Sequence, residues 1–279
     1  MKYQECYMEG RTALQQAGIA EADLDARLLL EYICGTNRND LLVHGDREVE
    51  AEKLTAYRTT IAKRSERIPL QHITGAQDFM GLEFRVNEHV LIPRQDTEIL
   101  VEEVMRDIQD NSRILDMCTG SGCILISLLH YSNWCEGVGV DISKEALEVA
   151  AANGEALLPI EKRPTWLESN LFEAVEGKFD IIVSNPPYIR TEVIDTLMPE
   201  VRIHEPIRAL DGTEDGLFFY RKIVLEAPGY LHKEGRLYFE IGHDQAEEVS
   251  KLMEKAGFSD IRVVKDYAGL DRVVCGILR

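Results

Sequence analysis

Hydrophobic residues recur at helical spacing in residues 1–68. Two runs, 3–17 and 24–33, place apolar side chains three or four positions apart, as on one face of an α-helix. Gly35 stands where the second helix would end, and a more polar helix is expected from Val49 to Ser65. The pattern predicts a small helical bundle without a cluster of catalytic side chains. Such a bundle would serve recognition or packing.

The helical pattern stops at Pro69. From Phe79 to Val86, apolar residues alternate with other residues around Gly81, which predicts a β-hairpin. We therefore expect three parts in the chain. They are the helical domain 1–68, a β-hairpin linker over 69–92 and a main domain over 93–279.

Strand and helix patterns alternate in the main domain. Strands are expected at 113–117, 137–141, 164–167 and 181–184, and helices at 99–108, 124–130 and 146–152. A polar connection over 191–207 precedes a helix at 217–227, a strand at 235–241, a helix at 245–256 and a hairpin of 261–265 with 272–277. Alternating strands and helices indicate an α/β fold with a mostly parallel sheet, whose last strand we expect to be antiparallel.

The first two expected strands have the features of a nucleotide-binding unit. A glycine-bearing turn at 118–122 joins the first strand to a helix, and Asp141 ends the second strand. Small residues let the backbone approach a ligand, and a carboxylate can accept hydrogen bonds from ribose hydroxyls. The turn lacks the Gly-Lys-Ser/Thr ending of a phosphate loop, and Leu125 replaces the third glycine of the dinucleotide fingerprint.

A rigid turn follows the fourth expected strand, at Asn185-Pro186-Pro187-Tyr188. Each proline fixes its own φ and disfavours a helical conformation at the residue before it. The Asn185 side-chain oxygen and the Pro186 carbonyl could bind the two hydrogens of a planar –NH2 group, and Tyr188 could stack on that group. Such a turn would catalyse by orientation and electrostatics, without an ionised base. The alternative is a turn that only ends a strand. The expected convergence of Gly120, Asp141, Asn170 and Asn185 at one sheet edge favours a site.

Composition limits the remaining possibilities. The chain has 279 residues, a net charge of −18 and 45% hydrophobic residues, with no apolar run of membrane-spanning length and no signal-peptide pattern at Met1. We expect a soluble, cytoplasmic protein without a membrane partner. The six cysteines are scattered, which predicts reduced thiols and no metal site. The acidic balance argues against a broad nucleic-acid-binding surface.

These motifs resemble those of class I S-adenosylmethionine-dependent methyltransferases that act on amide or exocyclic amine nitrogen. More narrowly, the chain resembles the HemK/PrmC family, which methylates the glutamine of the Gly-Gly-Gln motif in class 1 peptide chain release factors. The resemblance covers nearly the whole chain. Its most specific blocks are Pro69-Leu70-Gln71, Phe79-x-Gly81-Leu82-x-Phe84, Ile92-Pro93-Arg94-x-Asp96-Thr97-Glu98, Glu205-Pro206 and Asp215-Gly216-Leu217. It implies a Rossmann-like methyltransferase sheet with a small N-terminal helical domain.

The resemblance also implies roles for the motif residues. The cofactor-binding positions would be Cys118, Thr119, Gly120, Ser121 and Gly122 around the methionine part, Asp141 at the ribose hydroxyls, Asn170 and Leu171 at the adenine, and Asn185. Asn185, Pro186, Pro187 and Tyr188 would hold the substrate glutamine amide; Asn185, Pro186 and Tyr188 are the expected catalytic residues.

Two positions depart from the pattern of this family. Cys118 replaces the usual first glycine of the turn, and Asn170 replaces a frequent Asp. Because a Cβ disfavours positive φ, we expect Cys118 to adopt negative φ. Asn170 keeps an acceptor oxygen for the adenine amino group but lacks the charge.

The predicted function is methyl transfer from S-adenosyl-L-methionine to the side-chain nitrogen (N5) of a release-factor glutamine. The expected partner is a class 1 peptide chain release factor, without direct nucleic-acid binding, and the expected state is a monomer. Two alternatives remain. The first is methylation of an adenine or guanine amino group in DNA or RNA, which uses the same turn chemistry. The second is a cofactor-binding scaffold without turnover.

Overall fold

The computed structural model describes all 279 residues. The chain divides into two compact units. The first comprises residues 1–76 together with 198–204, and the second comprises 77–197 together with 205–279.

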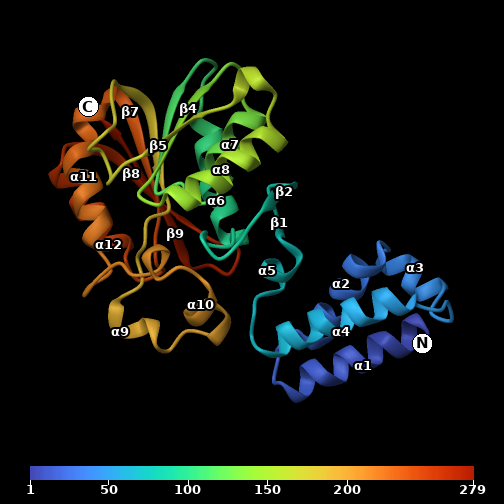
Figure 1. Cartoon of the computed structure of the whole chain (residues 1–279). Coiled ribbons are helices and arrows are strands. Elements are labelled where there is room, and N and C mark those ends of the chain that lie inside the picture. The colour runs from blue at the N-terminus through green and yellow to red at the C-terminus, as the bar shows by residue number, and fades with distance from the viewer. The chain divides into compact units, whose positions relative to one another are not determined.

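The first unit is built mainly of helices (Figure 1). Its helices are α1 (Tyr3–Gln16), α2 (Ala22–Cys34), α3 (Arg38–Val43), α4 (Ala51–Ser65), α5 (Leu70–Thr74) and α10 (Pro199–His204). Leu14, Leu29 and Tyr57 are buried in its core. A buried Arg64 guanidinium binds Asp25 at 2.7 Å and Glu200 at 3.1 Å, and so joins α2, α4 and α10.

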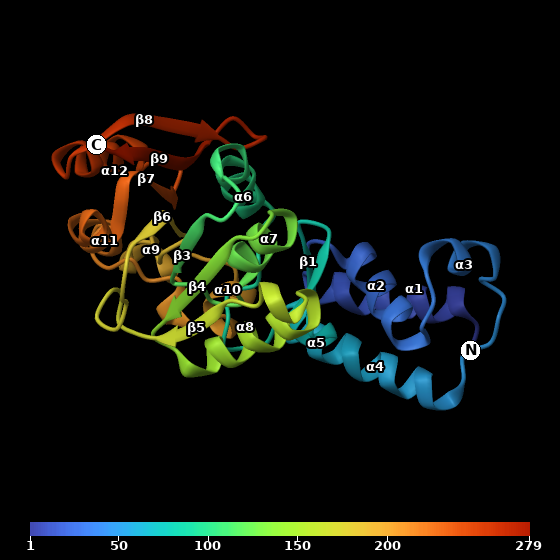
Figure 2. The same cartoon turned by 90° about the horizontal axis from the view of Figure 1, so that it is seen from above.

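The second unit is built on a seven-stranded sheet in the order β5-β4-β3-β6-β7-β9-β8 (Figure 2). Its strands are β3 (Arg113–Met117), β4 (Glu136–Asp141), β5 (Thr165–Glu168), β6 (Phe179–Ser184), β7 (Leu231–Glu240), β8 (Phe258–Lys265) and β9 (Asp271–Leu278). The pairs from β5 to β7 are parallel, whereas β9 is antiparallel to both of its neighbours. The predicted α/β class, with the final strand of the chain antiparallel, is confirmed.

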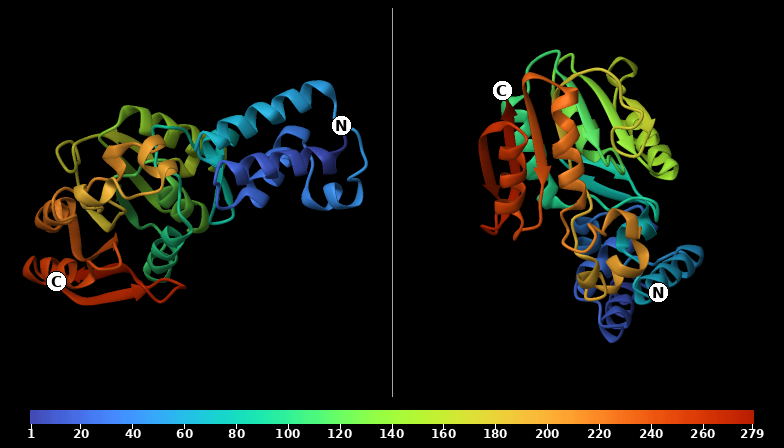
Figure 3. Two further views of the ribbon diagram at one scale, coloured as in Figure 1. Left: turned by 90° about the horizontal axis from the view of Figure 1, so that it is seen from below. Right: turned by 90° about the vertical axis from the view of Figure 1, so that its left-hand side faces the viewer.

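Helices cover both faces of the sheet. On one face lie α6 (Gln95–Asp107), α7 (Cys123–Tyr131) and α8 (Lys144–Leu157); on the other lie α11 (Phe218–Tyr230) and α12 (Ala246–Lys255) (Figure 3). Ile114 of β3 packs with the first group, and its neighbours Leu115 and Met117 pack with the second group. This alternation buries both faces of the sheet, as expected for a parallel α/β architecture.

A hairpin of β1 (Ala76–Phe79) and β2 (Leu82–Arg85) precedes the sheet. Phe79 and Phe84 are buried in the same hydrophobic cluster as α6 and α7. The Glu98 carboxylate accepts a hydrogen bond from the Met80 amide at 2.7 Å. The hairpin therefore packs as part of the second unit from residue 77 onward.

The expected polar connection at 191–207 is partly wrong. It contains two short helices, α9 (Thr191–Ile194) and α10, followed by the 3₁₀ turn Ile207–Ala209. Helices this short carry too little hydrophobic periodicity to be recognised in the sequence. None of the helices is long and apolar enough to cross a membrane.

Candidate active site

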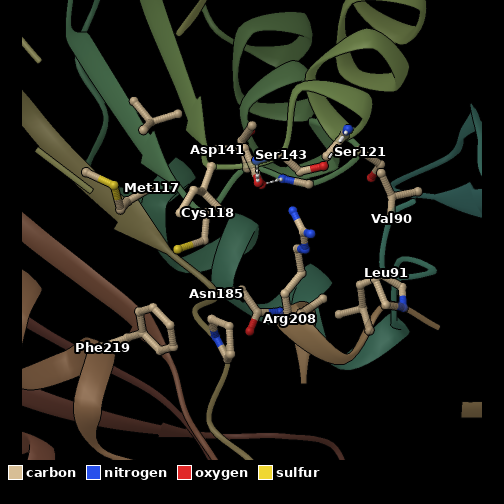
Figure 4. Close-up of a pocket in the computed structure, with 18 of the residues that line it drawn as sticks. Val90, Leu91, Met117, Cys118, Ser121, Asp141, Ser143, Asn185, Arg208 and Phe219 are labelled. Carbon is tan, nitrogen blue, oxygen red and sulfur yellow. Dashed lines mark hydrogen bonds between the residues drawn. The ribbon is translucent and has the colours of Figure 1, made fainter. Parts of the chain in front are cut away.

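A cavity of about 450 Å³ lies at the carboxyl ends of the central strands. Its walls come from the loops that follow β3, β4, β5 and β6 and from residues 206–211. Figure 4 shows Cys118, Asp141 and Asn185 around this hollow, with the Arg208 side chain reaching into it. The edge where parallel strands end is where open α/β sheets bind ligands.

The structure brings most of the sequence-predicted site residues to this cavity. Those that line it are Cys118, Thr119, Gly120, Ser121, Asp141, Asn170, Leu171, Asn185 and Pro187. Gly122, Pro186 and Tyr188 do not line it. A Cβ at Gly122 would lie 2.8 Å from the Trp166 ring, so this glycine allows close packing at the start of α7.

The loop after β3 exposes its backbone to the cavity at Gly120. No atom lies within 4 Å of the position that a Cβ would occupy there, and φ is +55°. The loop is fixed to the neighbouring strand β4, because the Thr119 amide donates to the Val140 carbonyl at 2.9 Å. Gly120 therefore leaves open space for a ligand on a loop that is held in place.

The expectation of negative φ at Cys118 is wrong, because φ is +63°. This left-handed conformation costs a residue with a Cβ about 1–2 kcal/mol. The residue before it, Met117, is paired with Val140 on one side and Ser184 on the other, so the sheet determines how the chain leaves β3. The conformation follows from strand geometry, which overrides the local preference of the cysteine.

Two carboxylates lie at the base of this loop. Asp141 accepts hydrogen bonds from the Gly120 and Ser143 amides, both at 2.9 Å. Burial raises the pKa of Asp141, and these amides oppose the shift. Asp116 is fully buried beneath Thr119, whose hydroxyl donates to it, and burial raises the pKa of Asp116 to about 7.

The Asn185 side chain is held by one hydrogen bond. Its Nδ2 donates to the Thr97 Oγ1 at 3.3 Å, whereas Oδ1 accepts no hydrogen bond from the chain. Both residues line the cavity. The structure therefore presents an amide oxygen with a free lone pair, which can accept a hydrogen from a ligand.

Tyr188, the last residue of the turn, is anchored away from the cavity. The Tyr188 hydroxyl donates to Glu240 Oε1 at 3.3 Å, and the Tyr188 carbonyl accepts from Gln245 Nε2 at 3.0 Å. Gly212 and Gly216 pack on the Tyr188 backbone so closely that a Cβ at either would lie 2.4–2.7 Å from it. The loop at 209–216 thus supports the turn, and Asp211 in this loop lines the cavity.

A further contact holds the segment that carries Arg208. Arg94 donates to the buried Glu205 at 2.6 Å. Burial raises the pKa of Glu205, and Arg94 opposes this shift. This ion pair connects the start of α6 to the cavity wall at 206–208.

Sequence reasoning missed several of these supporting residues. In the sequence, Thr97 stands out only as part of the block from Ile92 to Glu98, and Glu240 only as part of the expected strand at 235–241. A signal for Glu240 was present, since an acidic residue directly after the apolar run Leu237-Tyr238-Phe239 resembles Asp141 in its position at the carboxyl end of a strand. Gln245 and Arg208 carry no signal of this kind, because their roles depend on tertiary contacts.

Two family models match the chain. Residues 5–75 match the PrmC N-terminal domain, and residues 94–211 match the methyltransferase small domain.

Similar proteins match over nearly the full length. A release factor glutamine methyltransferase of Agrobacterium fabrum is 41% identical, with 95% of this chain and 93% of the relative covered. One of Geobacter sulfurreducens is 43% identical with the same coverage, and one of Clostridium acetobutylicum is 40% identical with 99% of each chain covered.

Solved structures share the fold. A methyltransferase from Pyrococcus furiosus has a TM-score of 0.55 at 18% identity, covering 77% of this chain and 98% of its own. The E. cuniculi Mtq2-Trm112 complex, described as responsible for methylation of the eRF1 translation termination factor, has a TM-score of 0.50 at 19% identity, covering 68% and 99%. At these identities the likeness concerns the fold alone.

Proposed function

Because the chain belongs to the release factor glutamine methyltransferase family, we propose that it methylates the side-chain amide nitrogen of a release-factor glutamine. The methyl donor is S-adenosylmethionine, and the target is the glutamine of the Gly-Gly-Gln motif in class 1 peptide chain release factors. The observation that carries this proposal is the Asn185 side chain, whose Oδ1 is free at the cavity while its Nδ2 is engaged.

The cavity residues fit the cofactor. When bound, S-adenosylmethionine supplies the methyl group as an electrophile on a positively charged sulfur. Gly120 leaves room for a ligand against the backbone, and Asp141 offers carboxylate oxygens to ribose hydroxyls. Asn170 and Leu171 would border the adenine. The cavity volume of about 450 Å³ lies within the usual range for small-molecule sites.

Asn185 and Pro186 would orient the substrate amide. The nitrogen of an amide is a poor nucleophile because its lone pair is delocalised. Two acceptors, the Asn185 Oδ1 and the Pro186 carbonyl, would bind its two hydrogens and so direct the lone pair toward the methyl group. Positioning and preorganised electrostatics of this kind supply the rate without a strong base. The nitrogen would release its proton to water after methyl transfer.

Pro187 and Tyr188 complete the proposed substrate site. Pro187 lines the cavity, and Tyr188 is fixed at its hydroxyl and its carbonyl. We propose that the Tyr188 ring contributes a flat surface next to the amide.

We propose that the helical domain at 1–68 recognises the release factor and that the domain at 93–279 catalyses methyl transfer. Residues 69–92 would link these two domains. We further propose that the protein acts as a monomer in the cytoplasm, where translation provides its substrate, and that it requires no direct contact with nucleic acid.

The test is transfer of labelled methyl from S-adenosylmethionine to a purified release factor. A second release factor, with the glutamine of Gly-Gly-Gln replaced by alanine, serves as the matched control, and purified RNA and DNA are assayed in parallel. We expect label on the first release factor only. Label on RNA or DNA instead would replace the proposal with an exocyclic amine methyltransferase. Cofactor binding without label on any of these substrates would favour a scaffold.

A further inference from the structure

The orientation of the Asn185 amide decides what the cavity offers to a substrate. An amide side chain has an accepting end and a donating end of nearly the same shape. If the amide were rotated by half a turn, –NH2 would face the substrate nitrogen and the acceptor would be lost. Some feature of the protein must therefore hold the observed orientation.

Thr97 is the contact that holds it. The Thr97 Oγ1 accepts from Asn185 Nδ2 at 3.3 Å, and the Thr97 side chain is buried. A hydroxyl has one hydrogen and can also act as a donor, so Thr97 alone would accept either end of the amide. The observed orientation of the Asn185 amide is preferred only if a third group accepts the Thr97 hydrogen, because the Thr97 oxygen can then act only as an acceptor.

Glu240 is placed to be that third group. Its carboxyl is buried, with Oε1 accepting from the Tyr188 hydroxyl at 3.3 Å. Thr97 lies next to this carboxyl and lowers its pKa, and Oε2 is buried without a hydrogen-bond partner, so it is free to accept the Thr97 hydrogen. If the Thr97 hydrogen points to Glu240, the Thr97 oxygen can only accept from Asn185. The direction of the hydrogen bonds from Asn185 to Thr97 and from Thr97 to Glu240 then sets which end of the Asn185 amide faces the cavity.

We propose that Thr97 and Glu240 are positioning residues that fix the Asn185 amide with its oxygen toward the substrate nitrogen. The proposal rests on the proposed function, because it concerns how the acceptor of that reaction is held. Glu240 also fixes Tyr188, so one buried carboxylate orients both polar side chains of the catalytic turn.

The charge state of Glu240 provides a readout. Burial raises the pKa of Glu240 to about 7, while Thr97, Arg272 and Tyr188 lower it and Asp96 raises it. The titratable and charged groups around this carboxyl are Asp96 on α6, Cys123 on α7, Tyr188 on the turn, Tyr220 on α11 and Arg272 on β9. Protonation would turn one oxygen from an acceptor into a donor. With the proton on the oxygen that faces Thr97, the carboxyl would donate to Thr97, and the orientation of Thr97 would be lost as the pH falls below about 7.

The decisive variants are Thr97→Val and Thr97→Ser. Valine has nearly the shape of threonine but no hydroxyl, so we expect kcat for release-factor methylation to fall roughly 10- to 100-fold. Cofactor affinity, measured by calorimetry, should stay within about threefold, because Thr97 acts on the substrate side. Serine keeps the hydroxyl and should restore most of kcat. Unchanged kcat in Thr97→Val, or failure of Thr97→Ser to restore it in a folded protein, would overturn the proposal.

Two further measurements separate positioning from general damage. In an Asn185→Ala background, Thr97→Val should cause no further loss of kcat, since Thr97 acts through Asn185. Additive losses would overturn the proposal. Glu240→Gln should remove the fall in kcat on the acidic side of about pH 7, and an unchanged pH profile would contradict the role of Glu240.

A measurement that needs no substrate can test whether Thr97 holds the Asn185 amide even if the proposed function is wrong. The side-chain amide signal of Asn185 in the NMR spectrum, assigned by its loss in Asn185→Ala, should exchange faster with water in Thr97→Val than in wild type. If wild type labels no release factor, the proposed function fails, and this exchange rate still decides whether Thr97 holds the amide. Equal exchange in both proteins would overturn the inference.

Discussion

Gly212 packs against the Asn185–Tyr188 turn with no room for a side chain. A Cβ built at this position lies 2.7 Å from the Tyr188 Cα, 2.8 Å from the Tyr188 carbonyl carbon and 2.9 Å from the Gly216 Cα. Ordinary contact begins near 3.4 Å, so the Tyr188 backbone would have to move by roughly 0.7 Å. All three atoms belong to backbone and cannot rotate away.

We therefore expect Gly212→Ala to damage activity and stability together. Overpacking of this kind costs about 1–3 kcal/mol of unfolding free energy. A displacement approaching 1 Å at a positioning element can lower the rate about 100-fold. The assays are urea unfolding and methyl transfer to a release factor at saturating substrates.

Gly229 offers the matched control. It lies in α11, and a Cβ there would meet no atom within 4 Å. Gly229→Ala should keep the wild-type rate and raise stability by about 0.4–1 kcal/mol. A Gly212→Ala protein with the stability and rate of wild type would refute the close packing that we derive for this loop.

Three further substitutions test the site. Asn185→Ala should reduce methyl transfer by at least about 100-fold while cofactor affinity changes by less than about tenfold, because the lost acceptor acts mainly in the transition state; a wild-type rate would exclude the proposed role of Asn185. At position 118, Cys118→Gly should be more stable to urea than Cys118→Ala by about 1 kcal/mol, since φ is +63° there; the opposite order would mean that the left-handed conformation is not strained. Burial raises the pKa of Asp116 to about 7 from its ordinary value of 3.8, so the native state keeps a proton that the unfolded state releases. Between these values stability should fall as the pH rises, by at most about 1.4 kcal/mol per pH unit, and Asp116→Asn should remove this slope in urea unfolding; the same slope in both proteins would contradict the assignment.

The sequence was sufficient to predict that the site residues lie together, because each of them stands at the end of a strand. Gly120 follows one strand, Asp141 ends a second and Asn185 follows a third, and parallel strands bring their carboxyl ends to one edge. Local pattern and sheet topology together are sufficient for this inference. The antiparallel final strand was expected for another reason, namely the closing hairpin of 261–265 with 272–277.

The details that depend on tertiary packing could not be predicted. The conformation of Cys118 is set by the strands on either side of β3, against the preference of its own Cβ. Thr97 and Asn185 meet across 88 positions of sequence, and no local pattern indicates which hydroxyl an amide will bind. The short helices α9 and α10 were missed for a different reason, since they have too few turns to show a period.

The central claim is that this chain methylates one amide nitrogen in a release factor. The most direct measurement is tandem mass spectrometry of the Gly-Gly-Gln peptide after incubation of the protein with S-adenosylmethionine and a purified release factor. We predict a single added methyl group on the side-chain nitrogen of that glutamine, and none when Asn185→Ala replaces wild type. A methyl group on another residue, or an unmodified peptide from a protein that binds the cofactor, would contradict the account.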